Sequence, residues 1–270
     1  MTEALSELVK VQFGVESTPG QSTAANRLFT SFGVRLRPAI DVDEFTPAGY
    51  VDPTIVAPVT ELSEGDIDGR GTYTDLVYLL NGALATGTIA TPDGATLTRT
   101  HTFLQNPTGV SEKKTFTVER SNGVVNEKAV GCRVTSLNLD FSGNNLSIGG
   151  TLRGGPLASG ITMTTTPTAI PVVPVMRSQI SVYIDAPGVD AEACDSALGT
   201  TKLTRTRVGA LTLADLASPF YAHDAANGLG PATWVDRRGT KGITLRMMRD
   251  ATAMALLANT RNSDLRLMRI

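Results

Sequence analysis

The 270-residue chain is poor in the residues that usually carry catalysis or bind metal ions. It has two cysteines, Cys132 and Cys194, which are too few and too far apart for a disulfide framework or a zinc site. It has two histidines, His101 and His223, and neither a phosphate-binding loop nor a serine elbow is present. These absences argue against an enzyme, and we expect no catalytic residue, no cofactor and no metal.

Long apolar runs and an excess of positive charge are also missing. No run of about 18 apolar residues occurs, so we expect no transmembrane helix. The opening MTEALSELVK lacks the basic and apolar regions of a secretion signal. The 24 Lys and Arg residues against 26 Asp and Glu give a net charge of −2. That balance argues against a dedicated nucleic-acid binder, which needs clustered positive charge.

Threonine, glycine and proline are abundant instead, with 36, 26 and 14 copies. The β-branch of threonine fits a pleated strand, while glycine and proline mark turns. Apolar and polar residues alternate in segments such as 97–103 and 115–119, and Ser121-Asn122-Gly123 predicts a type I′ hairpin turn. We therefore predict a mainly β fold, built as a sandwich or barrel.

Two helices are expected within this β-rich chain. Residues 74–85 carry leucines and an alanine at helical spacing, and Thr72 or Thr74 can cap the first turn. A second, short helix is predicted over 250–259. Residues 1–38 form an N-terminal arm in our division, residues 39–270 form a single β-rich domain, and a Thr- and Pro-rich joint lies near 160–176.

Four segments of the chain carry a family resemblance. Residues 11–20 are similar to an opening arm, and the stretch from Glu64-Gly65 to Tyr78 to an acidic-glycine loop followed by a tyrosine-bearing helix. Residues 114–119 and 134–154 resemble the next strand and hairpin. Together they resemble the tail tube (major tail) proteins of long-tailed bacteriophages. The resemblance implies a β-sandwich or barrel subunit that forms hexameric rings, stacked into a hollow tube that delivers DNA to the bacterial host.

The same resemblance implies partners and a location. The partners would be further copies of the chain, a tape-measure protein, tail-end and connector proteins, and DNA that passes without specific binding. The protein would be assembled in the host cytoplasm and reside in the tail of the virion.

Contacts between subunits are expected from the arm or from the loop over 41–58. The arm lacks a pattern that would bury a face of its own, so we predict that one of these segments lies on a neighbouring subunit. The candidate contact residues are Phe13, Val15, Pro19, Asp41, Phe45 and Tyr50.

A tube that lets DNA pass needs a wall that does not hold phosphate. We therefore expect a neutral to acidic lumen with small polar side chains. The candidates are Glu61, Glu64, Asp66, Asp68, Glu119, Thr100 and Thr117. One alternative is that these acidic residues are solvated on outer loops. Another is a calcium loop, because Glu64 to Asp75 has the length of one, with its first and last ligand types reversed.

Two other functions stay open at this point. One is a different β-rich virion or surface module, such as a distal tail or receptor-binding domain, for which Phe220, Tyr221 and Trp234 are the aromatic cluster. The other is a hydrolase with paired carboxylates, for example Asp41 with Glu44.

Overall fold

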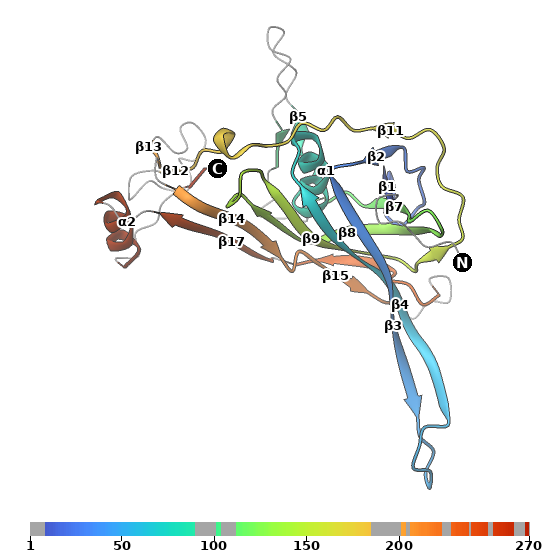
Figure 1. Cartoon of the computed structure of the whole chain (residues 1–270). Coiled ribbons are helices and arrows are strands. Elements are labelled where there is room, and N and C mark those ends of the chain that lie inside the picture. The colour runs from blue at the N-terminus through green and yellow to red at the C-terminus, as the bar shows by residue number, and fades with distance from the viewer. Residues whose placement is uncertain are drawn as a thin grey trace.

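Strands make up most of the chain (Figure 1). The computed structural model describes residues 9–89, 101–103, 112–184, 201–203, 206–222, 228–237, 239–247, 251–261 and 268–269. Within these ranges the chain is mainly β with two α-helices, which confirms the predicted fold class. Neither of these two helices is long and apolar enough to cross a membrane.

One long strand, β8 (Asn126–Asp140), is shared by two sheets. Its first half pairs with β7 (Phe116–Ser121), which pairs in turn with β1 (Lys10–Val15). The sheet continues through β2 (Arg27–Phe29) to β11 (Thr168–Ala169). We call this the first sheet.

The second sheet forms around the other half of β8. On one side β8 pairs with β9 (Ser147–Gly154), followed by β4 (Ile55–Arg70) and β3 (Phe32–Phe45). On the other side it pairs with β14 (Thr206–Ala214), followed by β17 (Thr240–Met247). The order of the second sheet is therefore β3-β4-β9-β8-β14-β17. The shorter elements are β5 (Thr88–Ile89), β6 (His101–Thr102), β10 (Ala158–Ser159), a 3-10 turn (Arg177–Gln179), β12 (Tyr183–Ile184), β13 (Thr201–Lys202), β15 (Ala217–Phe220), β16 (Thr233–Asp236) and β18 (Met268–Arg269).

The main core lies between the two sheets and is rich in phenylalanine. The Phe13 ring lies 4.7 Å from Phe29 and 5.6 Å from Phe116, measured between ring centroids. Leu79 joins them from the helix and is fully buried. Since Phe13 and Phe116 belong to the first sheet and Val34 and Leu152 to the second, the apolar cluster bridges both sheets.

Helix α1 (Tyr73–Ala83) matches the predicted helix to within two residues. Thr72 is its N-cap, and the Thr72 hydroxyl accepts a hydrogen bond from the Asp75 amide at 3.2 Å. Gly82 brings the helix close to the core, because a Cβ there would lie 2.6 Å from the Phe116 ring. The second helix, α2 (Ala251–Arg261), confirms the short helix predicted near the C-terminus.

The predicted N-terminal arm is part of the two sheets: β1 and β2 belong to the first sheet, and from Phe32 on the chain forms β3 of the second sheet. Strand β1 lies between β2 and β7, and Val11 and Phe13 are buried in the core. Gln12, on the opposite face of β1, is also buried. A strand that is buried on both faces does not alternate between apolar and polar residues. Without that alternation, the sequence of β1 was interpreted as an arm and not as a strand of the sheet. The prediction that Phe13 contacts a neighbouring subunit is wrong.

The Thr- and Pro-rich segment 160–176 is an extended strap that passes the α1 end of the molecule (Figure 1). Its Thr164 amide and hydroxyl donate to the Glu119 carboxylate at 2.7 and 3.2 Å. Further along, the Val175 amide donates to the Gly71 carbonyl, and the Leu146 amide donates to the Val175 carbonyl. The strap thus ties the first sheet to the start of α1.

The β7–β8 connection is the predicted hairpin with a different turn. Gly123 is left-handed, with φ of 85°, but Asn122 is not. The Asn122 side-chain oxygen accepts instead from the amides of Val124 and Val125, at 3.0 and 2.7 Å. The hairpin is confirmed, and the type I′ assignment is wrong because the asparagine side chain organises a longer loop.

Candidate assembly surfaces

Strands β3 and β4 extend far beyond the second sheet as a two-stranded hairpin (Figure 1). Their pairing runs from Phe32 opposite Gly69 to Phe45 opposite Ile55. Residues 38–59 lie outside the core, and we call them the projecting hairpin. The predicted loop over 41–58 is therefore a continuation of two strands that closes in a short turn.

The projecting hairpin exposes large apolar side chains. Its charged residues are Asp41, Asp43, Glu44 and Asp52, and it contains no lysine or arginine. A two-stranded hairpin alone is marginally stable, and contiguous exposed apolar surface marks an interaction site. Of the predicted contact residues, Asp41, Phe45 and Tyr50 lie here. The large apolar side chains, all between 51% and 96% exposed, are Ile40, Val42, Phe45, Tyr50, Val51, Ile55, Val56 and Val59.

The base of the projecting hairpin is held by the β15–β16 side of the molecule. The Glu61 amide donates to the Leu229 carbonyl at 2.8 Å. Burial raises the pKa of Tyr221, whose phenol forms a hydrogen bond with Thr60. These contacts fix the direction in which the hairpin leaves the body.

A buried charge cluster anchors β16 in turn. Asp236 Oδ1 lies 3.2 Å from Lys113 Nζ and 3.0 Å from an Arg133 guanidinium nitrogen. Burial lowers the pKa of Lys113 and of Arg133, and the Asp236 carboxylate opposes that shift in both. The Lys113 ammonium also donates to the Leu216 carbonyl at 2.8 Å. The cluster clamps the β15–β16 hairpin to the sandwich.

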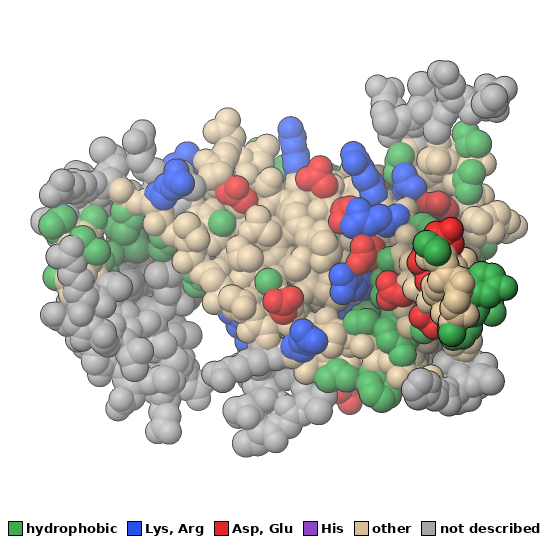
Figure 2. Space-filling view, turned by 90° about the horizontal axis from the view of Figure 1, so that it is seen from below, with side chains coloured by type: hydrophobic (Ala, Val, Ile, Leu, Met, Phe, Trp, Pro, Cys, Tyr) green, Lys and Arg blue, Asp and Glu red, His purple; other side chains and the backbone are tan. Residues whose placement is uncertain are grey.

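The outer face of the second sheet is polar. Alternate residues of its strands point away from the core. Those of β8, β9, β14 and β17 are mostly small and uncharged, whereas charges of both signs lie on β3 and β4, near the base of the hairpin (Figure 2). We call this surface the polar face. Its residues include Arg35, Arg37, Glu64, Asp66, Asp68, Ser136, Asn138, Thr151, Arg153, Thr212 and Thr244.

Two acidic residues of the polar face, Glu64 and Asp66, are paired with arginines from adjacent strands. Arg37 lies 3.2 Å from both Glu64 and Asp66, and Arg153 lies 2.8 Å from Glu64. Three of the predicted lumen residues, Glu64, Asp66 and Asp68, thus share one surface. This surface is close to neutral, because the register places Arg35 and Arg37 opposite Asp66 and Glu64.

Other predicted lumen residues do not lie on the polar face. Glu119 and Thr117 are buried, where Glu119 holds the strap and the Thr117 hydroxyl donates to Glu16 at 2.9 Å. Neither can line a channel, so both predictions are wrong. On β4, Glu61 and Ser63 belong to the alternate residues that point away from the polar face, so Glu61 is not part of that face. Thr100 lies outside the described residues.

The calcium-loop alternative is also wrong. Glu64, Asp66 and Asp68 lie in a continuous strand that pairs on both edges, so they cannot wrap around an ion. No group of three or more His, Cys, Asp or Glu residues suited to a metal ion occurs in the described part of the chain.

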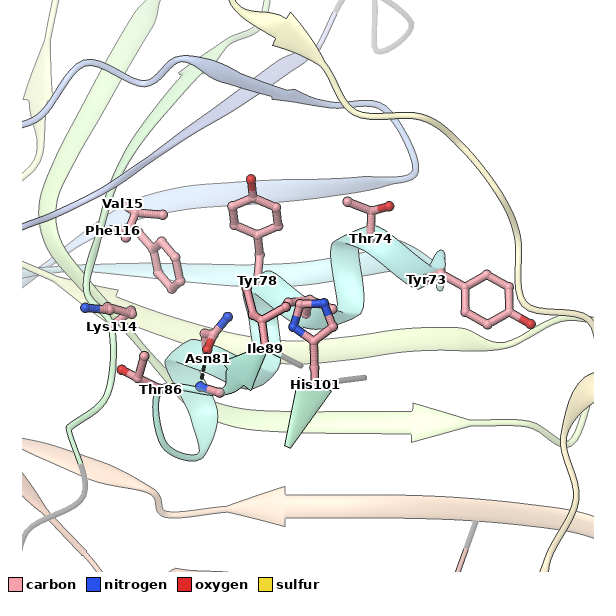
Figure 3. A pocket seen from close by; sticks show the side chains of 12 residues that line it. Val15, Tyr73, Thr74, Tyr78, Asn81, Thr86, Ile89, His101, Lys114 and Phe116 are labelled. Carbon is pink, nitrogen blue, oxygen red and sulfur yellow. Dashed lines mark hydrogen bonds between the residues drawn. The ribbon is translucent and has the colours of Figure 1, made fainter. Parts of the chain in front are cut away.

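A hollow of about 830 Å³ opens beside α1 (Figure 3). It is bounded by α1, the start of β7 and the short β5–β6 pair, and Asn81 closes one side by accepting from the Gly87 amide at 2.7 Å. We call it the α1 hollow. The predicted contact residue Val15 opens onto it and is 40% exposed, while Pro19 lies exposed in the turn after β1. Its lining residues are Val15, Tyr73, Thr74, Val77, Tyr78, Asn81, Thr86, Gly87, Ile89, His101, Lys114 and Phe116.

The threonines and the asparagine of the polar face were not among the residues predicted to line the channel, although their strands were predicted. The signal was the alternation in residues 136–140 and 147–153, where every second residue is apolar or glycine. The aromatic cluster proved less open than expected, since Phe220 is 51% exposed but Tyr221 and Trp234 are half-buried.

Comparison with known proteins does not assign the chain to a family. No protein-family model matches the chain, and no curated protein matches it.

Proposed function

We propose that this chain is the structural subunit of the tail tube of a long-tailed bacteriophage. In this proposal it assembles into hexameric rings that stack into a hollow tube for DNA delivery. The observation that supports this best is the open second sheet, which presents a polar face of balanced charge between two outer strands. The resemblance of several sequence segments to tail tube proteins supports it as well.

The outer strands of the second sheet supply the ring contact. Among the described strands, β3 pairs only with β4, and β17 pairs only with β14. Open edges invite further pairing, and closing a sheet across subunits removes them. In the proposed ring, the edge of β17 in one subunit meets the edge of β3 in the next, and one continuous sheet surrounds the channel.

The polar face would then line the channel. DNA is held by clustered positive charge, but Arg37 and Arg153 are engaged by Glu64 and Asp66. DNA would therefore pass without specific binding. The further partners in this proposal are a tape-measure protein inside the tube and connector and tail-end proteins at its ends, in the tail of a virion assembled in the host cytoplasm.

Negative-stain electron microscopy of the concentrated, purified protein tests this proposal. We expect rings or tubes for the wild type. Ile243→Lys places a charge on edge strand β17, where charged side chains oppose edge pairing, and should leave folded monomers. The matched control is Met254→Lys on exposed α2, which should assemble normally. Wild-type protein that stays monomeric at every concentration contradicts the proposal and favours a distal tail or receptor-binding module.

A further inference from the structure

We propose that the projecting hairpin of one copy docks into the α1 hollow of a second copy. The contact would join successive rings and therefore presupposes the proposed tube, for which it names the axial binding site.

The two surfaces match in chemistry. The hairpin offers exposed apolar side chains, among them Phe45, Tyr50 and Val51, together with acidic residues and no base. The α1 hollow is lined by apolar and aromatic side chains together with two threonines and an asparagine. In the described part of the chain, its charged or titratable side chains besides tyrosine are Lys114 and His101. Among the residues that the structure describes, no acidic residue lines it. An apolar, acidic tip and an apolar, basic recess are complementary.

The α1 hollow also has room and open apolar surface for such a tip. Its volume of about 830 Å³ lies within the roughly 300–1,000 Å³ of pockets that bury a small ligand. Ile89, Tyr73 and Val15 on its lining are 59%, 47% and 40% exposed. Covering them together with the hairpin tip would remove apolar surface from water on both partners.

The positions of the two surfaces favour a stack. The hairpin tip lies at one end of the molecule, and α1 with β5 lies at the opposite end (Figure 1). A contact between two different patches is heterologous, and where its rotation does not close it generates an open assembly. Repeated docking of tip into hollow therefore propagates along one axis.

The occupant of the hollow has to come from another copy. The contacts of Glu61 with Leu229 and of Tyr221 with Thr60 direct the chain's own hairpin away from α1. Pairing of two hairpin tips is disfavoured, because each carries four acidic residues and no base, and like charges at an interface repel. The hollow of a second copy avoids this repulsion.

Mixed disulfide formation tests the docking directly. In a Cys194→Ser background, a Val51→Cys protein is mixed with a Thr74→Cys protein and oxidised gently. Val51 is 96% exposed at the hairpin tip, and Thr74 is an exposed residue at the hollow. We expect the Val51–Thr74 heterodimer to exceed both homodimers. The matched control replaces Thr74→Cys by Asn138→Cys on the polar face, and this mixture should lose the heterodimer.

A charge reversal gives a second readout. Lys114→Glu places an acid in the α1 hollow, and it should raise the protein concentration needed for stacking by about tenfold or more while single rings persist. Lys10→Glu, exposed at the start of β1, is the control and should stack normally.

The outcomes separate the two proposals. Stacked rings without the Val51–Thr74 heterodimer, or normal stacking of Lys114→Glu, would show that the hairpin docks elsewhere and would leave the tube proposal standing. Wild-type protein that forms neither rings nor stacks would instead overturn the tube proposal and this contact with it.

Discussion

Glu16 is a buried side chain whose two carboxylate oxygens accept four hydrogen bonds. It accepts from the amides of Gly20 and Gly131 and from the hydroxyls of Thr115 and Thr117, at 2.8 to 2.9 Å. A buried charge is costly unless such partners surround it. The carboxylate therefore fixes the turn after β1 against β7 and β8, and it explains why Thr115 and Thr117 are buried although both are polar.

Leu79 offers a direct test of the core at the scale of one residue. Leu79→Asp would bury an unpaired charge among Phe116, Val134 and their neighbours, and we expect a loss of about 3–5 kcal/mol in the free energy of unfolding. Thr74→Asp, on the exposed first turn of the same helix, is the control and should change stability by less than about 0.5 kcal/mol. Urea unfolding followed by circular dichroism measures both. A Leu79→Asp protein as stable as the wild type would show that α1 does not pack on the sheets.

Single-residue roles were the hardest to predict from sequence. The threonine alternation in 115–119 correctly predicted a strand, but it suggested a water-facing stripe. The hydroxyls of Thr115 and Thr117 serve Glu16, which lies 99 and 101 positions away in the chain. The spacing of neighbouring residues cannot indicate a hydrogen-bond partner that is so distant in the sequence. By contrast, Thr72 was a recognisable cap because its partner, the Asp75 amide, is three residues away.

At the scale of elements, the projecting hairpin can be removed without touching the core. Asp41 pairs with Thr60, so replacing residues 42–59 by Asn-Gly leaves a two-residue hairpin loop. We expect this variant to keep the thermal unfolding midpoint within a few degrees, since the deleted side chains are exposed. It should form rings but no stacks in sedimentation velocity and electron microscopy. Stacks of normal length would contradict a role for the hairpin in assembly.

The sequence predicted which segments form helices and strands better than it predicted which of them are buried. The leucine spacing identified α1, and alternation identified β7, β8 and β9. Strand β1 was misread because residues 11–14 are buried on both faces of the strand and residues 11–13 pair on both edges. Deleting residues 1–20 would therefore remove a central strand and should unfold the domain, contrary to what an arm would predict.

At the scale of the whole molecule, the polar face should determine whether the proposed tube binds DNA. Asn138, Thr212 and Thr244 are exposed and uncharged there. Changing all three to lysine should leave the ring intact and give it salt-dependent affinity for duplex DNA, because each phosphate contact releases counterions. The same three sites changed to glutamine are the control. Fluorescence anisotropy at low and moderate salt measures binding, and strong DNA binding by wild-type rings would contradict a neutral channel.

The pairing of β1 with β7 has a consequence for the order of events during synthesis. Val11 lies opposite Arg120 in the sheet, so the first strand has only the three-residue β2 beside it until residue 121 has left the ribosome. At about 5–20 residues per second, that wait lasts several seconds or more. Through this time Val11 and Phe13, which are later fully covered, remain exposed in the nascent chain. Slow delivery of a distant partner makes folding intermediates prone to aggregation. Yield in the cell should therefore depend on chaperone supply and on growth temperature more steeply than the stability of the finished domain would suggest.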